Sequence, residues 1–299
     1  MYVVNDGKRY PFSKGILAKS LYQTGVPLEE AYAIVSDILD SIPDEVEDIS
    51  TEDLKKQASV KLIERGWKEE ERFYRLRDAM AELNSPVFIL LGGGSGVGKT
   101  TLATEVGRRL GIDRIVGTDT VREIMRGILS PELVPTLHES TYNAMDRLKT
   151  PYITDKLIYA FSQQVSLVNK GIGSVIERGM KEGLDMIVDG VHIVPGYLES
   201  VLSEIPDYMF QYVIDVPDPE THRRHFYSRE KDSLRDPERY LDNFDRINRI
   251  HEYILDVARK RNVKVLENSD LTLAIDTIIS DTITRIEQNE ATVGVNLEK

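Results

Sequence analysis

The 299-residue sequence contains no cysteine and one tryptophan. The absence of cysteine excludes disulfide bonds and thiolate metal sites, and it favours a cytoplasmic location. No apolar run approaches the roughly 20 residues that a membrane helix needs. Residues 1–12 also lack the apolar region of a secretory signal. We therefore expect a protein without a membrane partner.

Basic residues are fewer than acidic ones. The chain has 38 Lys and Arg against 50 Asp and Glu, which gives a formal net charge of −12. A surface that holds a polynucleotide normally presents a basic field, so nucleic acid is not an expected partner. An anionic ligand must instead be bound in a local pocket, which favours a small anionic metabolite. The composition leaves a homo-oligomer open.

The clearest break in the sequence is an Asn-Ser-Pro cluster at residues 84–86, which favours a turn. Before it, two short strand-like segments flank Asn5-Asp6-Gly7 as in a β-hairpin, and helical patterns follow. After it, apolar runs alternate with amphipathic segments, as in a parallel sheet covered by helices. We predict two domains: a small, mostly helical one over residues 1–83 and an α/β one over residues 86–299.

Five strands are expected in the second domain, at residues 87–91, 114–117, 186–189, 209–216 and 263–266. The pattern predicts a helix over 99–110 and two helices, over 152–169 and 173–182, between the second and third strands. The segment after about residue 285 is expected to be a polar tail. A five-stranded parallel sheet of this kind is typical of the P-loop nucleoside-triphosphate-hydrolase fold.

The strongest motif lies between the first strand of this domain and its helix. Residues 93–100, GGSGVGKT, match G-x-x-x-x-G-K-[ST] at every fixed position. Glycines let such a loop curl so that backbone N–H groups face a phosphate, and the following helix directs its positive end there. Lys99 can reach the β- and γ-phosphates of ATP and acts in catalysis. The predicted nucleotide-binding residues are Gly93, Gly94, Ser95, Gly96, Val97, Gly98, Lys99, Thr100 and Thr101.

A second motif supplies a candidate metal site. The apolar residues 186–188 lead into Asp189, which has the form of a Walker B strand. A carboxylate at this position can hold a magnesium-bound water beside Thr100, whose hydroxyl can also bind the ion. We therefore predict Mg²⁺ at Thr100 and Asp189. His192 follows closely and is assigned to the substrate site by its position, although a lone histidine is more often structural.

The end of the second strand of this domain offers a candidate site for the phosphoryl acceptor. Asp119 follows it, and Arg122 and Arg126 lie on one face of the next predicted helix. Arginine binds phosphate or carboxylate through paired hydrogen bonds, and a carboxylate can orient a hydroxyl. We predict that Asp119 is catalytic and binds substrate, and that Arg122 and Arg126 bind substrate. A helix cap followed by a solvated basic face is the alternative interpretation.

A basic segment, THRRHFYSRE at residues 221–230, follows the fourth strand of this domain. Basic helices at this place can form a lid that closes over the phosphates and stabilises the charge of the transition state. We predict such a lid, with Arg229 as its catalytic arginine. An exposed helix of mixed charge is the alternative.

Several segments resemble the archaeal 2-phosphoglycerate kinases over residues 87–273: LLGGGSGVGKTTLA, GTDTVREIMRG, LHESTYNA, DMIVDGVHIVPG and THRRHFYSRE. In front of them, DGKRYPFSKGILAKSLYQTGV resembles the ATP-cone, a small regulatory nucleotide-binding module that this family also carries. The resemblance implies ATP-dependent phosphorylation of the 3-hydroxyl of 2-phosphoglycerate. The product would be 2,3-bisphosphoglycerate, the precursor of cyclic 2,3-diphosphoglycerate.

Two other functions stay open at this point. One is a P-loop kinase of another small alcohol, such as an inositol, a sugar or a nucleoside. The other is a nucleotide-sensing regulator that phosphorylates no acceptor. Asp119 and the arginine-rich segment favour transfer, because a sensor needs neither a positioned acceptor nor charge stabilisation. Residues 1–83 are compatible with a working nucleotide sensor and with a structural cap.

Overall fold

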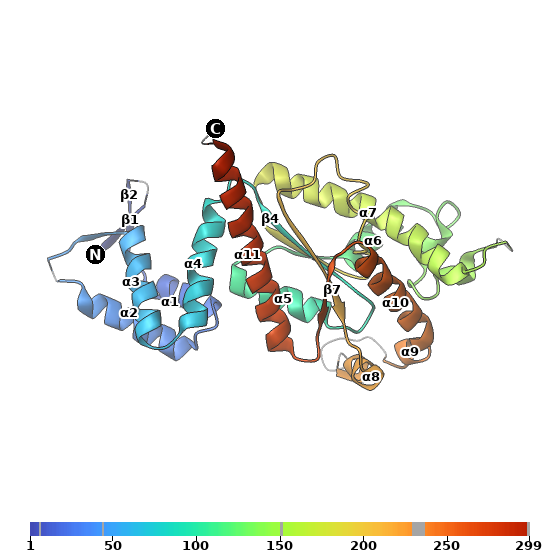
Figure 1. The fold of residues 1–299 in the computed structure, drawn as a ribbon, viewed down its shortest axis with the longest axis horizontal. Helices are drawn as coiled ribbons and strands as arrows, with labels where there is room; N and C mark the ends of the chain where they lie inside the picture. The colour runs from blue at the N-terminus through green and yellow to red at the C-terminus, as the bar shows by residue number, and fades with distance from the viewer. Residues whose placement is uncertain (6, 44, 150–151, 229–236, 298–299) are drawn as a thin grey trace. The chain divides into compact units, whose positions relative to one another are not determined.

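The computed structural model describes residues 1–5, 7–43, 45–149, 152–228 and 237–297. Contacts between residues group the chain into two compact units. One consists of Met1–Leu83 with Arg108–Gly111, and the other of Asn84–Gly107 with Ile112–Lys299. Figure 1 shows the elements in chain order by colour. Among the helices described, none has a stretch long and apolar enough to cross a membrane.

The first unit combines a small sheet with four helices. β1 (Tyr2–Asn5) pairs antiparallel with β2 (Lys8–Pro11) and parallel with β3 (Asp48–Ser50). The helices are α1 (Lys14–Gln23), α2 (Leu28–Ser41), α3 (Thr51–Glu64) and α4 (Lys68–Glu82). Their apolar faces meet in one core, in which Leu21 and Ile34 are fully buried. The sequence predicted the hairpin and the helices but not β3, because three residues are too few to show an alternating pattern.

The second unit is built on a five-stranded sheet in the order β5-β6-β4-β7-β8, with all strands parallel. Its strands are β4 (Val87–Gly92), β5 (Ile115–Gly117), β6 (Met186–Asp189), β7 (Tyr208–Asp215) and β8 (Lys264–Glu267). The register places both Leu91 and Gly117 opposite Asp189, so the carboxyl ends of β4, β5 and β6 meet. The sheet and the predicted fold class are confirmed.

Helices cover both faces of this sheet, with α7 and α10 on one side and α5 and α11 on the other (Figure 1). Phe88 and Leu90 of β4 pack toward α7, whereas Tyr212 of β7 donates a hydrogen bond to Asp281 of α11 at 2.9 Å. The helices are α5 (Lys99–Leu110), α6 (Thr118–Ile128), α7 (Lys156–Glu182), α8 (Pro219–Ser228), α9 (Glu238–Leu241), α10 (Phe244–Lys260) and α11 (Leu271–Leu297), with 3-10 turns η1 (Pro135–His138) and η2 (Ala144–Arg147). α11 continues through the segment predicted as a polar tail.

One element prediction was wrong. A single helix of 27 residues, α7, occupies the region where two helices were expected. A Cβ atom on Gly171 would lie 2.7 Å from Cγ1 of Val121, and one on Gly173 would lie 3.2 Å from Cγ2 of Val201. These glycines therefore admit close packing of neighbouring segments instead of ending the helix.

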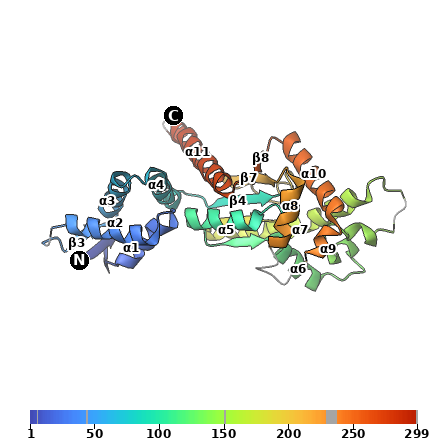
Figure 2. The same ribbon diagram turned by 90° about the horizontal axis from the view of Figure 1, so that it is seen from below.

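α8, α9 and α10 lie beside one another (Figure 2). Their aromatic rings pack together: Phe226 of α8 stacks on Tyr240 of α9 with centroids 5.2 Å apart, and it meets Phe244 of α10 edge-on at 6.5 Å. This packing holds the amino-terminal part of the predicted lid segment against the body of the second unit.

Candidate active site

The loop between β4 and α5 has the conformation that its glycines suggest. Gly93, Gly96 and Gly98 have φ angles of 134°, 91° and 85°, in the region that favours glycine. A Cβ atom on Gly93 would lie 2.5 Å from the carbonyl oxygen of Ile214, so only glycine permits this approach to β7. The loop curls at the amino end of α5, where backbone N–H groups and the helix dipole favour a phosphate.

The charged and hydroxyl groups of the two predicted motifs meet at this edge of the sheet. The Nζ atom of Lys99 donates to the carbonyl oxygen of Gly94 at 2.5 Å, and the side chain is buried. The hydroxyl of Thr100 donates to Oδ2 of Asp189 at 2.7 Å. Both oxygens belong to the hard ligands that Mg²⁺ prefers, so the pair fits a magnesium ion. Among the described residues no three His, Asp or Glu side chains gather as a metal site, so phosphates and water would supply the other ligands.

Two of the predicted substrate residues lie together at the start of α6. This helix begins at Thr118 and carries Asp119 in its first turn. Nη2 of Arg122 is 3.7 Å from Oδ1 of Asp119, and its Nη1 donates to the carbonyl oxygen of Glu139 at 2.9 Å. The side chain of Arg122 is 15% exposed and that of Asp119 is 55% exposed. A carboxylate open to solvent therefore sits beside a largely buried cation.

The two arginines retain unused donors. Arg126, one turn further along α6, donates through Nη1 to Glu123 at 2.7 Å, and its side chain is 33% exposed. Within the described part of the chain, the Nε atoms of Arg122 and Arg126 are buried without a hydrogen-bond partner. An unpaired buried donor is costly unless a ligand accepts from it, so this helix face fits an anion.

His192 contacts Thr118 at the start of α6 and Gln164 of α7. It is fully buried, with Nδ1 at 2.9 Å from the hydroxyl of Thr118 and Nε2 at 3.2 Å from Oε1 of Gln164. The amide of Gln164 then donates to the carbonyl oxygen of Glu139 at 3.1 Å, the same oxygen that accepts from Arg122. A continuous polar chain therefore joins the start of α6 to the guanidinium of Arg122.

The environment of His192 keeps its ring neutral. Burial lowers its pKa to about 3, and the positive charges of Arg122 and Lys99 act in the same direction against the opposing charge of Asp119. The sequence assigned His192 a direct contact with substrate. In the structure both of its ring nitrogens have protein partners, and the assignment stays a prediction.

Sequence reasoning missed several residues that shape the site. Gln164 carries no recognisable motif, because a glutamine in an amphipathic helix looks like any polar residue. Four further residues contact the backbone of the P-loop: His222, His225, His251 and Asn268. No local pattern marks them, because each contacts a part of the chain more than 120 residues away.

The predicted lid is described only in part. Arg224 donates to the hydroxyl of Thr221 at 2.7 Å, and the guanidinium of Arg223 lies 4.0 Å from the ring centroid of Phe244. Both arginines thus have partners on or beside α8. Arg229, the predicted catalytic arginine, lies outside the described residues.

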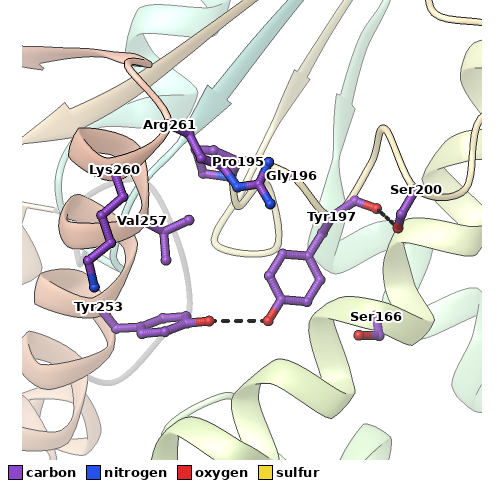
Figure 3. Close-up of a pocket in the computed structure, with 9 residues that line it drawn as sticks. All are labelled: Ser166, Pro195, Gly196, Tyr197, Ser200, Tyr253, Val257, Lys260 and Arg261. Atoms are coloured by element: carbon purple, nitrogen blue, oxygen red, sulfur yellow. Dashed lines mark hydrogen bonds between the residues drawn. The ribbon is translucent and has the colours of Figure 1, made fainter.

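A separate pocket of about 500 Å³ lies between α7, α10 and the loop that follows β6 (Figure 3). The hydroxyls of Tyr197 and Tyr253 are 3.2 Å apart across it. The guanidinium of Arg261 covers Gly196, where an added Cβ atom would lie 2.1 Å from Cζ. None of the residues assigned above to nucleotide, metal or acceptor lines this pocket, so it is distinct from the candidate site.

These features define a class of protein. A glycine-rich loop that joins a central parallel strand to a helix, with a lysine at its end and a carboxylate bonded to the next threonine, is the site of a P-loop kinase. A family model described as an AAA domain matches residues 88–254.

Proteins named 2-phosphoglycerate kinase match almost the whole chain. The protein from Thermococcus kodakarensis is 39% identical over 292 residues, 96% of this chain and 99% of its own. That from Methanopyrus kandleri is 40% identical over 273 residues, 90% of this chain and 83% of its own. That from Methanocaldococcus jannaschii is 36% identical over 277 residues, 92% of this chain and 89% of its own.

The chain belongs to the 2-phosphoglycerate kinase family, and the resemblance noted in the sequence is confirmed. It is therefore an ATP-dependent phosphotransferase. A solved structure of an uncharacterized protein from Eubacterium ventriosum aligns with 66% of this chain and 98% of its own, at 15% identity and a TM-score of 0.36. These values are too low to argue a shared fold.

Proposed function

We propose that this protein transfers the γ-phosphoryl group of ATP to the 3-hydroxyl of 2-phosphoglycerate, giving ADP and 2,3-bisphosphoglycerate. The observation that carries the acceptor assignment is the face of α6: Asp119 is exposed, Arg122 lies 3.7 Å from it, and the Nε atoms of Arg122 and Arg126 lack a hydrogen-bond partner among the described residues. 2-Phosphoglycerate offers the matching groups: a phosphate and a carboxylate for the arginines, and a primary hydroxyl for Asp119. The names of the relatives support the same acceptor.

In this proposal each side chain has a separate role in the transfer. Arg122 and Arg126 bind the anionic groups of the acceptor, and Asp119 orients the 3-hydroxyl toward the γ-phosphorus. The hydroxyl oxygen forms a new bond to phosphorus while the bond to the β–γ bridging oxygen breaks, and ADP leaves. The hydroxyl proton passes to Asp119 or to water. Lys99 stabilises the charge that develops on the transferred group.

The nucleotide and the metal complete the proposed site. The backbone of residues 93–101 holds the phosphates of ATP, and Thr100 and Asp189 hold Mg²⁺. When bound, the ion neutralises charge on the β- and γ-phosphates. Through Gln164, His192 fixes the carbonyl of Glu139 and, with it, the orientation of Arg122.

The direct test is an ADP-release assay with a panel of acceptors: 2-phosphoglycerate, 3-phosphoglycerate, glycerate, an inositol, a sugar and a nucleoside. We expect 2-phosphoglycerate to react with the highest kcat/KM, and ³¹P NMR to show two phosphomonoester signals in the product. A higher kcat/KM with another alcohol would reassign the acceptor. ATP binding without turnover on any acceptor would favour a nucleotide sensor.

A further inference from the structure

The P-loop is held from outside by side chains that lie far away in the sequence. Each of three successive carbonyl oxygens has a side-chain partner at hydrogen-bond distance: Ser95 with Nε2 of His222 at 2.7 Å, Gly96 with Nδ1 of His225 at 2.9 Å, and Val97 with Nδ2 of Asn268 at 2.9 Å. Because a carbonyl oxygen only accepts, these contacts fix the donor atom on each side chain.

In a fourth contact the backbone of the loop is the donor and the side chain accepts. The backbone N–H of Gly94 donates to Nδ1 of His251 at 3.0 Å, so the ring proton sits on Nε2, which donates to Oδ1 of Asp215 at 2.8 Å. Burial, the largest single effect, would raise the pKa of Asp215, but His251, the backbone N–H of Val216 and the charge of Arg259 together outweigh it and hold that pKa below its usual value. Asp215 stays charged and holds the imidazole in this tautomer.

These contacts determine which way the loop's N–H groups point. A peptide unit is planar and trans, so its C=O and N–H bonds point in opposite directions. When the carbonyls of residues 95–97 are held outward, the N–H groups of residues 96–98 face inward, where a phosphate binds. A glycine-rich segment would otherwise sample many conformations, and fixing them costs conformational entropy.

The loop and its supports also fit each other sterically. A Cβ atom on Gly96 would lie 2.5 Å from Cζ of Phe226, and one on Gly98 would lie 2.3 Å from Nδ2 of Asn268. The glycines thus serve both the curl of the loop and the approach of the side chains that hold it.

We propose that His222, His225, His251 and Asn268 are positioning residues that hold the P-loop in its phosphate-binding form before ATP arrives. Because the ordering cost is met in folding, less of the binding energy of ATP is spent on it. Two of the four belong to α8, so the helix predicted as part of a lid also supports the loop. The inference concerns the ATP site of the proposed function. It depends on that function only where an effect on phosphoryl transfer is expected, and not for ATP binding itself.

The test uses the full chain and replaces each histidine by an amide side chain whose N–H donor lies at the position of one or the other ring nitrogen. The amide nitrogen of glutamine lies near the place of a histidine Nε2, and that of asparagine near the place of Nδ1. We therefore expect His222→Gln and His225→Asn to bind ATP within threefold of the wild-type Kd. The exchanged pair, His222→Asn and His225→Gln, should weaken ATP binding tenfold or more, as should His222→Leu, His225→Leu and Asn268→Leu.

Isothermal titration with ATP and Mg²⁺ gives the Kd values, and circular dichroism confirms that each variant is folded. The matched control is His138→Leu, which removes an imidazole contact to the carbonyl of Leu129, at 2.7 Å, away from the P-loop. Its ATP Kd should equal that of the wild type.

The proposal would be overturned if His222→Gln bound ATP no more tightly than His222→Asn, and His225→Asn no more tightly than His225→Gln. This comparison holds even if the leucine variants fail to fold. Equal weakening by the control would also overturn the proposal. The titration contains no acceptor. The ATP Kd values therefore test this proposal even if 2-phosphoglycerate proves not to be the substrate.

Discussion

At the scale of single residues, the proposed function assigns positioning of the acceptor to Arg122 and Arg126 and chemistry to Asp119. The carboxylate of Asp119 is open to solvent, whereas the side chain of Arg122 is largely buried and donates to the carbonyl oxygen of Glu139. The two kinds of residue should therefore affect different kinetic constants.

Asp119→Asn should lower kcat by on the order of 100-fold or more, because the amide cannot accept the hydroxyl proton or orient it equally well. The KM for ATP should change little, since Asp119 lies on α6 and not on the P-loop. Steady-state kinetics with each substrate varied in turn would show this. Asp256→Asn, which alters an exposed ion pair on α10, is the control and should leave kcat unchanged.

Arg122→Ala and Arg126→Ala should chiefly raise the KM for 2-phosphoglycerate. The loss of a hydrogen bond to a charged group costs about 2–3 kcal/mol, or roughly 30- to 150-fold in kcat/KM. The effect should be larger at Arg122, the more buried of the two. A rise in the KM for ATP with an unchanged acceptor KM would assign this face of α6 to the nucleotide.

Two buried histidines should make the protein sensitive to acid. Burial lowers the pKa of His192 to about 3 and that of His222 to about 4. In the unfolded chain both take up protons below about pH 6.5, while in the folded chain they stay neutral. The free energy of unfolding is therefore undiminished by these histidines above pH 6.5. Below pH 6.5, each histidine lowers it by about 1.4 kcal/mol per pH unit until the pH reaches the pKa of that histidine in the folded chain.

Urea unfolding at pH 7 and pH 5 would measure this loss. In His192→Gln, which keeps a polar side chain but cannot titrate, the decrease in unfolding free energy between the two pH values should be smaller by about 2 kcal/mol. An equal decrease in wild type and variant would mean that His192 is not the group responsible.

At the scale of elements, the α6–α7 contact shows how a glycine inside a helix can serve packing. Gly171→Ala should lower the free energy of unfolding by about 1–3 kcal/mol, because the new methyl group would meet Val121 at 2.7 Å. Gly127→Ala, in α6, is the matched control: its Cβ atom meets nothing within 4 Å. That change should stabilise the protein by up to about 1 kcal/mol through helix propensity. Thermal unfolding of the two variants should shift Tm in opposite directions.

The same contrast explains what the sequence could and could not predict. The strand–loop–helix around Lys99 and the strand ending at Asp189 were predictable because their patterns are local in sequence. The unbroken α7 was not, because its glycines look like breaks until Val121 is placed beside them. Gln164 and His251 were missed for a related reason: their partners lie 25 to 157 residues away in the chain.

At the scale of the whole molecule, the residues assigned to nucleotide, metal and acceptor all follow residue 92, in the second unit. Deleting residues 1–83 should therefore leave a chain that phosphorylates 2-phosphoglycerate with a measurable kcat. The assay is run over a range of ATP concentrations, with circular dichroism to confirm folding. A folded truncation that is inactive at every ATP concentration would show that the first unit completes the site. The regulatory role suggested by the ATP-cone resemblance stays a prediction.

If the contacts around the P-loop act as proposed, they also set the point during synthesis at which the chain first binds ATP tightly. Gly94 pairs with a residue 157 positions later, and Val97 with one 171 positions later. A ribosome adds about 5–20 residues per second, so the loop emerges roughly 10–35 seconds before its last partner. Until Asn268 has emerged, the nascent chain carries a complete P-loop motif without its full set of proposed supports. By the inference above, tight ATP binding is among the last properties that the growing chain acquires, and a chain released early carries the motif without its supports.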